Sequence, residues 1–136
     1  MLSECAFVLC DNYKTTVQMS HTTEFSTRHL GDNLSKFPVV NTDPGVTRQV
    51  LADHPDLMVV AFEFAKQGAE GKLHNHPHIQ STFVKSGKFV FTIDDKEFDV
   101  EPGDSFVVPT NAVHGCVCLE PGTLIDSFTP RRDDFL

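Results

Sequence analysis

The stretch from Gly68 to Gly87 carries the side chains best suited to chemistry. A polar ring or amide stands there at every second position, as His74, His76, His78 and Gln80. A strand points alternate side chains to one face, so these four would lie together. Neutral imidazole is the commonest metal ligand in proteins, and the pattern therefore predicts a metal site. Because Pro77 interrupts regular strand pairing, the alternative is a polar loop whose histidines only form hydrogen bonds.

A second stretch, Gly103 to His114, adds a further histidine after a Gly-Asp turn, a short apolar strand and a Pro turn. The two stretches resemble the two motifs of the cupin superfamily. The first, G-x5-H-x-H-x3-E-x6-G, matches from Gly68 to Gly87 in spacing, and the second, G-x5-P-x-G-x2-H-x3-N, matches from Gly103 to Cys118. The resemblance implies an all-β fold, the cupin double-stranded β-helix or jelly-roll barrel.

Three positions depart from these motifs. Gln80 stands in place of a glutamate ligand, Asn111 in place of a turn glycine, and Cys118 in place of an asparagine. Asparagine tolerates left-handed backbone, so we expect the turn at Asn111 to be kept. A neutral amide at position 80 would leave the charge of a bound ion uncompensated. That charge would strengthen the ion as a Lewis acid and attract anionic substrates.

Composition limits the class of protein. The 136 residues suit one domain with a single core. A net charge of −8 without a basic stripe argues against a nucleic-acid partner. No run approaches the roughly 20 apolar residues of a membrane span, so no membrane partner is expected. Four cysteines are too few for a disulfide scaffold and the N-terminus lacks the basic region of a signal peptide, which together predict a cytoplasmic location.

The chain divides into two regions. Residues 1–34 are polar and weakly patterned, which predicts an N-terminal arm, partly disordered or paired with a sheet edge, with Met19 as an alternative start. Residues 35–136 predict a single barrel domain, because short apolar runs alternate with turns. The runs cover residues 37–40, 46–52, 57–64, 89–93, 96–100, 105–108, 113–119 and 123–128. With the histidine stretch they make about nine strands, as a jelly roll requires.

Strand parity assigns directions to several polar side chains. Asp126 shares parity with Leu124 and Phe128, which predicts a carboxylate that points into the barrel. A carboxylate in a cavity is costly and is a candidate for function. The opposite parity would leave Asp126 in solvent.

The same reasoning applies to the residues beside the histidines. Cys116 and Cys118 share the parity of His114, and we favour packing in the core over metal ligation for both. The turn at Pro77 leaves open whether His78 supports the ligands or faces a substrate.

The end of the chain sharpens the resemblance. Residues 124–136, LIDSFTPRRDDFL, are similar to the C-terminal signature of the KdgF-type cupins, small proteins of pectin and alginate degradation, and the likeness extends back to about Arg48. It implies metal ligation by His74, His76, Gln80 and His114, and catalytic positions for Asp126, Phe128 and Arg132. The cofactor would be one divalent transition metal, since Ni, Zn, Fe, Mn and Co all suit these ligands. Analogy with other small cupins predicts a homodimer.

The implied activity is the conversion of a 4,5-unsaturated uronate monosaccharide, a small sugar acid, to the linear 4-deoxy-5-keto uronate. This reaction needs a Lewis acid, an acid that protonates C4 and a cation for the carboxylate. We assign the second role to Asp126 and the third to Arg132, with Phe128 as a wall of the sugar site. Without the resemblance, Arg131 and Arg132 would suit a solvated charged tail. Two other functions stay open, a cupin-type metal-dependent dioxygenase and a non-catalytic sugar-binding module.

Overall fold

The computed structural model describes residues 37–136, so the predictions for the arm over residues 1–34 lie outside the described part. The described chain is almost entirely strand. Its elements are β1 (Val40–Asp43), β2 (Val46–His54), β3 (Leu57–Phe64), β4 (Glu70–His74), β5 (Ile79–Val84), β6 (Lys88–Ile93), β7 (Lys96–Val100), β8 (Ser105–Val108), β9 (His114–Glu120), β10 (Gly122–Thr129) and the 3-10 turn η1 (Asp133–Phe135). Within this part, no helix has the length and apolar character needed to cross a membrane.

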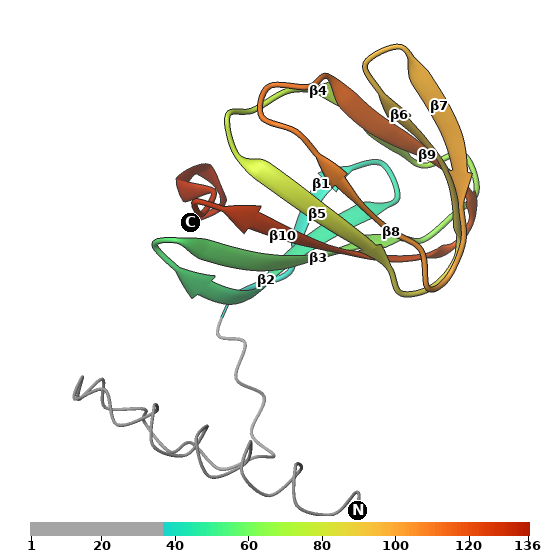
Figure 1. The fold of residues 1–136 in the computed structure, drawn as a ribbon. Coiled ribbons are helices and arrows are strands. Elements are labelled where there is room, and N and C mark those ends of the chain that lie inside the picture. The colour runs from blue at the N-terminus through green and yellow to red at the C-terminus, as the bar shows by residue number, and fades with distance from the viewer. Residues whose placement is uncertain (1–36) are drawn as a thin grey trace, which may run out of the picture. The chain divides into compact units, whose positions relative to one another are not determined.

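The strands form two antiparallel sheets that face each other (Figure 1). One sheet has six strands in the order β1-β2-β3-β10-β5-β8, and the other has four in the order β4-β9-β6-β7. The predicted all-β jelly-roll barrel is therefore confirmed. Because β5 and β10 are neighbours in the larger sheet and β4 and β9 in the smaller, segments far apart in the sequence meet inside the barrel.

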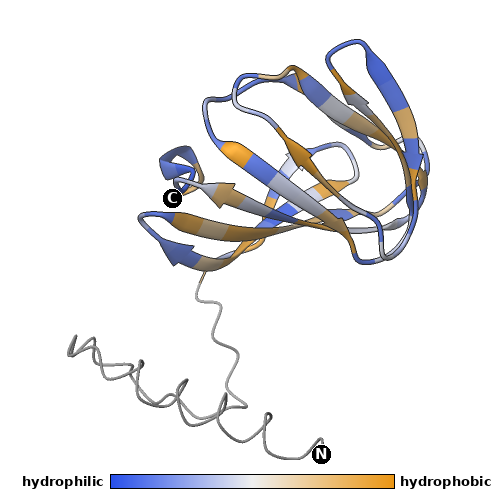
Figure 2. Ribbon diagram, viewed as in Figure 1, coloured by the Kyte–Doolittle hydropathy of each residue, from blue (hydrophilic) through white to orange (hydrophobic). Residues whose placement is uncertain are grey.

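Alternation along the strands places the core between the sheets. In β10 the buried side chains are Leu124, Asp126 and Phe128, while the residues between them are only partly buried. The same period of two appears in β5, where Gln80 and Thr82 face inward. Hydrophobic residues (orange) occupy much of the strands, and hydrophilic residues (blue) gather in the β6–β7 hairpin and the C-terminal turn (Figure 2). The inward face of the six-stranded sheet therefore combines apolar side chains with a few polar ones.

Two of the strand predictions were wrong in detail. Residues 37–39 are not strand, and β1 runs instead over Val40–Asp43 because its turn to β2 is Pro44-Gly45, with Gly45 at a φ of 82°. The histidine stretch is two strands rather than one, since β4 ends at His74 and β5 begins after Pro77. Proline has no N–H for the ladder, and this break gives ten strands in the described chain.

The turn chemistry expected at Asn111 is confirmed. Asn111 has a φ of 61°, the left-handed region that the motif fills with glycine. Its N–H donates to the backbone oxygen of His76 at 2.8 Å. The turn before β9 is thus tied to the loop between β4 and β5, and the two histidine stretches are held together by the backbone.

Candidate metal and substrate site

Three histidines from the two stretches meet at one end of the barrel. His74 closes β4 and lies opposite His114, the first residue of β9, while His76 lies in the loop before β5. Their ligand atoms all lie within 4.8 Å of one another, so the three side chains could hold a metal ion. His74 is exposed, whereas His76 and His114 are buried.

Backbone oxygens fix the orientation of each ring. The Nδ1 atoms of His74, His76 and His114 lie 2.8, 3.1 and 2.9 Å from backbone oxygens of residues 72, 78 and 112. Burial lowers the pKa of His76, and it lowers that of His114 to about 4, so both imidazoles are neutral at neutral pH. A carbonyl can only accept, so the Nδ1 atoms of the neutral His76 and His114 rings each carry the single proton. The Nε2 lone pairs are left for a ligand.

Gln80 completes the arrangement from β5. Its Oε1 atom lies 3.1 Å from Nε2 of His76 and 3.1 Å from Nε2 of His114. With Nδ1 protonated in both rings, these three atoms are all acceptors, and no proton stands between them. Acceptors converge at such distances when a cation lies among them. The residues present thus fit a metal ion that prefers nitrogen and oxygen ligands.

The amide of Gln80 is turned this way by a buried acid. Gln80 Nε2 donates to Asp126 Oδ2 at 3.1 Å and to Thr82 Oγ1 at 3.0 Å, and the Thr82 hydroxyl donates to Asp126 Oδ1 at 2.7 Å. The inward direction predicted for Asp126 is confirmed. Burial raises its pKa to about 7. A glutamate at position 80 would set a second carboxylate against Asp126, and the neutral amide avoids that repulsion.

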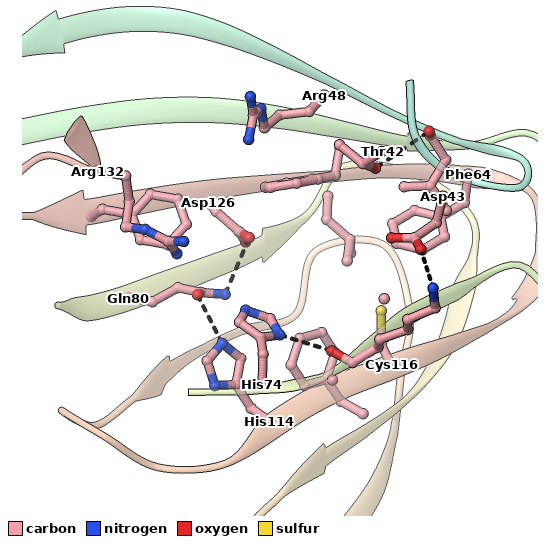
Figure 3. A pocket seen from close by; sticks show the side chains of 18 of the residues that line it. Thr42, Asp43, Arg48, Phe64, His74, Gln80, His114, Cys116, Asp126 and Arg132 are labelled. Carbon is pink, nitrogen blue, oxygen red and sulfur yellow. Dashed lines mark hydrogen bonds and ion pairs between the residues drawn. The ribbon is translucent and has the colours of Figure 1, made fainter. Parts of the chain in front are cut away.

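A cavity of about 300 Å³ opens in front of these groups (Figure 3). Six of the seven predicted site residues line it, namely His74, Gln80, His114, Asp126, Phe128 and Arg132. The seventh, His76, does not line the cavity, but its ring lies 5.6 Å from the Phe128 ring. Both sheets contribute walls, and much of the remaining lining is apolar, including Phe62, Phe64 and Leu124. The structure therefore gathers the predicted residues around one pocket.

Arg132 lies at the pocket and not in solvent. Its side chain is 11% exposed, and its guanidinium carbon lies 5.4 Å from the centre of the Phe128 ring. Asp134 accepts from Arg132 Nε at 2.9 Å and from Nη2 at 2.7 Å. Arg131 differs, since it pairs with Asp53 and Asp133 and does not line the cavity. Arg132 thus pairs with Asp134, as a charged tail balanced by acidic residues would, but it is not solvated as that interpretation requires.

Sequence reasoning missed two groups at the site. Thr82 does not line the cavity but hydrogen-bonds Gln80 and Asp126, and Arg48 lines the cavity. Thr82 shares parity with Gln80, and that spacing could have found it. Arg48 comes from β2 and has no local signal, because only the strand order brings it to the site. His78 contributes its backbone oxygen to His76, and its Nδ1 atom is buried without a hydrogen-bond partner among the described residues.

Neither cysteine of β9 is expected to react with a thiol reagent in the folded protein. Cys116 and Cys118 are unpaired and buried in the core, as the core-packing interpretation predicts, although Cys116 also lines the cavity. Burial raises the pKa of the Cys116 thiol to about 12. In a variant carrying Cys5→Ser and Cys10→Ser, titration with an aromatic disulfide reagent should detect no fast thiol. Both thiols should react once the chain is unfolded. Fast reaction of the native variant would contradict their burial.

Several known proteins are similar to this chain in fold and in sequence. The family model for the Cupin domain matches residues 60–128. Pectin degradation protein KdgF of Dickeya dadantii (strain 3937) is 40% identical over 94 residues, which are 68% of this chain and 84% of that protein. The structure of KdgF from Halomonas sp. matches with a TM-score of 0.69 and 40% identity, over 73% of this chain and 93% of that one. An RmlC-like cupin from Shewanella frigidimarina matches with a TM-score of 0.70 and 39% identity, over 74% and 90% of the two chains.

The matched residues span β3 to β10 and include all three histidines, Gln80 and Asp126. The fold and the site thus define a cupin barrel with a histidine cluster that could hold a metal ion. The chain belongs to the cupin family, and it is similar to the KdgF proteins over most of their length.

Proposed function

We propose that this protein is a metal-dependent enzyme of pectin or alginate breakdown that opens 4,5-unsaturated uronate monosaccharides to the linear 4-deoxy-5-keto uronate. The observation that carries the proposal is one pocket that joins a histidine cluster, a buried carboxyl group and arginine. The similarity to KdgF, whose name states a role in pectin degradation, supports the same substrate class. A homodimer and a cytoplasmic location stay predictions from the sequence.

The proposed ligands are His74, His76, Gln80 and His114. When bound there, one divalent transition metal (Ni, Zn, Fe, Mn or Co) would supply a Lewis acid to a substrate oxygen. The backbone acceptors at Nδ1 hold each ring with Nε2 turned inward. Asp126 and Thr82 hold the Gln80 amide so that its oxygen faces the imidazoles.

The reaction is an isomerisation and needs neither an oxidant nor a reductant. The anomeric hydroxyl of the substrate loses a proton, the bond from C1 to the ring oxygen breaks, a ketone forms at C5, and C4 gains a proton. In our proposal a carboxyl oxygen of Asp126 delivers the proton to C4. Phe128 forms a wall against the sugar, and Arg132 contributes positive charge for the substrate carboxylate.

Turnover of an unsaturated uronate tests this proposal directly. The metal-loaded protein should remove the ultraviolet absorbance of the conjugated enol ether of 4,5-unsaturated galacturonate faster than the spontaneous reaction does. Removal of the metal by a chelator should return the rate to the spontaneous one, and metal added back should restore it. A chelator-treated sample from which metal analysis finds no loss of ion serves as the control for effects of the chelator itself.

The alternatives give different results in the same assay. Consumption of O2 with a substrate that is oxidised would indicate a dioxygenase and would contradict the proposal. Uronate binding without any acceleration would indicate a sugar-binding module. A redox-inert metal such as Zn that supports turnover would exclude oxygen chemistry.

A further inference from the structure

Arg48 is a second guanidinium at the pocket that the proposed mechanism does not use. It lies on β2, opposite Phe62 of β3, and its half-buried side chain lines the cavity. Figure 3 shows Arg48, Arg132 and Asp126 toward one end of the pocket and Asp43 and Cys116 toward the other. The cationic end of the pocket is therefore the end that holds the buried acid.

Among the described residues, three cationic side chains other than histidine line the cavity, and two of them are already paired. Lys72 pairs with Asp43 at 2.8 Å, and Arg132 is held by Asp134 through both Nε and Nη2. Asp134 attracts Arg48 as well, but Arg48 forms no ion pair or hydrogen bond at contact distance with any described residue. Its fork of N–H donors is thus the one that is free for a ligand in this pocket.

The side chain of Arg48 is nevertheless held in position. Its guanidinium carbon lies 3.9 Å from the centre of the Phe135 ring, and the guanidinium carbon of Arg132 lies 4.3 Å from the same centre. Phe135 also packs on the Phe128 and Phe62 rings, at 5.7 and 6.3 Å. The Phe135 ring therefore fixes the guanidinium groups of Arg48 and Arg132 at one end of the pocket. Removing these two cations from water costs free energy, and a bound anion would offset that cost.

We infer that Arg48 makes the direct, bidentate contact with the carboxylate of the uronate, while Arg132, already neutralised in part by Asp134, contributes a second cation nearby. The inference deepens the proposed function and rests on it for the substrate class. A guanidinium fork matches the two oxygens of a carboxylate. In the substrate the carboxylate is attached to C5, next to C4, so its capture at the Arg48 end would set C4 toward Asp126.

Equilibrium binding of a stable sugar acid tests this assignment without turnover. Metal-loaded full-length protein is titrated with D-galacturonate and, in parallel, with neutral D-galactose, and binding is followed by NMR. Arg48→Gln should weaken D-galacturonate binding by at least about tenfold, because it removes a charge-assisted pair of hydrogen bonds, and should leave D-galactose binding unchanged. Arg48→Lys keeps the charge but not the fork of donors, so its affinity for D-galacturonate should lie between those of the wild type and Arg48→Gln.

Arg131→Gln is the matched control, since it removes the same charge from an arginine outside the cavity. It should bind D-galacturonate like the wild type. The inference is overturned if Arg48→Gln keeps wild-type affinity, if it loses D-galactose binding equally, or if the wild type does not prefer the sugar acid. Should Arg48→Gln fail to fold by circular dichroism, wild-type affinity in Arg48→Lys would overturn it.

The two proposals fail separately. If the wild type does not accelerate ring opening but binds D-galacturonate through Arg48, the reaction is wrong and the carboxylate site stands. If the wild type turns over the unsaturated uronate and Arg48→Gln retains both KM and D-galacturonate affinity, the proposed function stands and the role of Arg48 is wrong.

Discussion

Asp126→Asn is expected to lower the turnover of unsaturated uronate by about 10² to 10⁴, the usual range for loss of a general acid. Asparagine matches the shape of a protonated carboxyl group, so its Oδ1 can still accept from Gln80 and its Nδ2 can donate to the Thr82 oxygen. The amide of Gln80 would keep its direction toward the imidazoles. Metal content and the thermal midpoint should therefore stay close to those of the wild type. Steady-state kinetics measures the turnover, metal analysis the metal content, and thermal unfolding the midpoint.

Thr82→Val is the control for this change. It removes the hydroxyl that donates to Asp126 Oδ1 at 2.7 Å and accepts from Gln80 Nε2 at 3.0 Å, but it keeps the carboxyl group, the Gln80–Asp126 hydrogen bond and the shape of the side chain. If Asp126 delivers a proton, Thr82→Val should reduce turnover much less than Asp126→Asn does. An asparagine variant that keeps more than about a tenth of the wild-type rate would rule out the assigned role. A variant that loses its metal would indicate that Asp126 acts only by orienting Gln80.

His74→Ala should have the second large effect, the loss of stable metal binding and, with it, of turnover. Loss of a hydrogen-bond partner of a ligand typically costs about 10- to 100-fold in metal affinity, and loss of a ligand should cost more. His74 is the exposed member of the three histidines, so its truncation leaves no cavity in the core. The free energy of unfolding without metal should change by about 0.5 kcal/mol or less. Competition with a metal-sensitive dye measures the affinity.

His54→Ala provides the matched comparison. His54 is exposed at the end of β2 and does not line the cavity, so its replacement should change neither metal affinity nor turnover. Equal metal affinity in His74→Ala and the wild type would contradict ligation by His74. Equal losses in both variants would point to nonspecific binding of metal by surface imidazoles.

Much of the site can be predicted from short-range patterns. Alternation in a strand has a period of two, so large apolar residues two positions before and two positions after a polar residue indicate that the polar side chain faces the core. For this reason the inward direction of Asp126, between Leu124 and Phe128, follows from six residues of sequence and is confirmed. The left-handed turn at Asn111 is likewise a local property, because few residues other than glycine and asparagine adopt that backbone.

Boundaries that depend on a partner strand are less predictable. The apolar residues 37–39 suggest a strand, yet the strand lies later, where Asn41 and Asp43 pair with β2. The position of the Pro44-Gly45 turn sets that register, and the turn outweighs the hydrophobicity of the preceding residues. Similarly, hydrophobic spacing cannot show whether a proline bends one strand or separates two.

The sequence by itself determined that this chain consists of short β-strands and carries closely spaced histidines, because both patterns are local; the resemblance to cupins added the barrel and His114. Only the tertiary structure decided what surrounds these histidines. Gln80 and Asp126 are 46 positions apart, and they touch because β5 and β10 are neighbours. Arg48 reaches the same pocket from β2 by way of the strand order β2-β3-β10. Contacts across strands depend on which strands pair, and spacing along the chain does not specify that pairing.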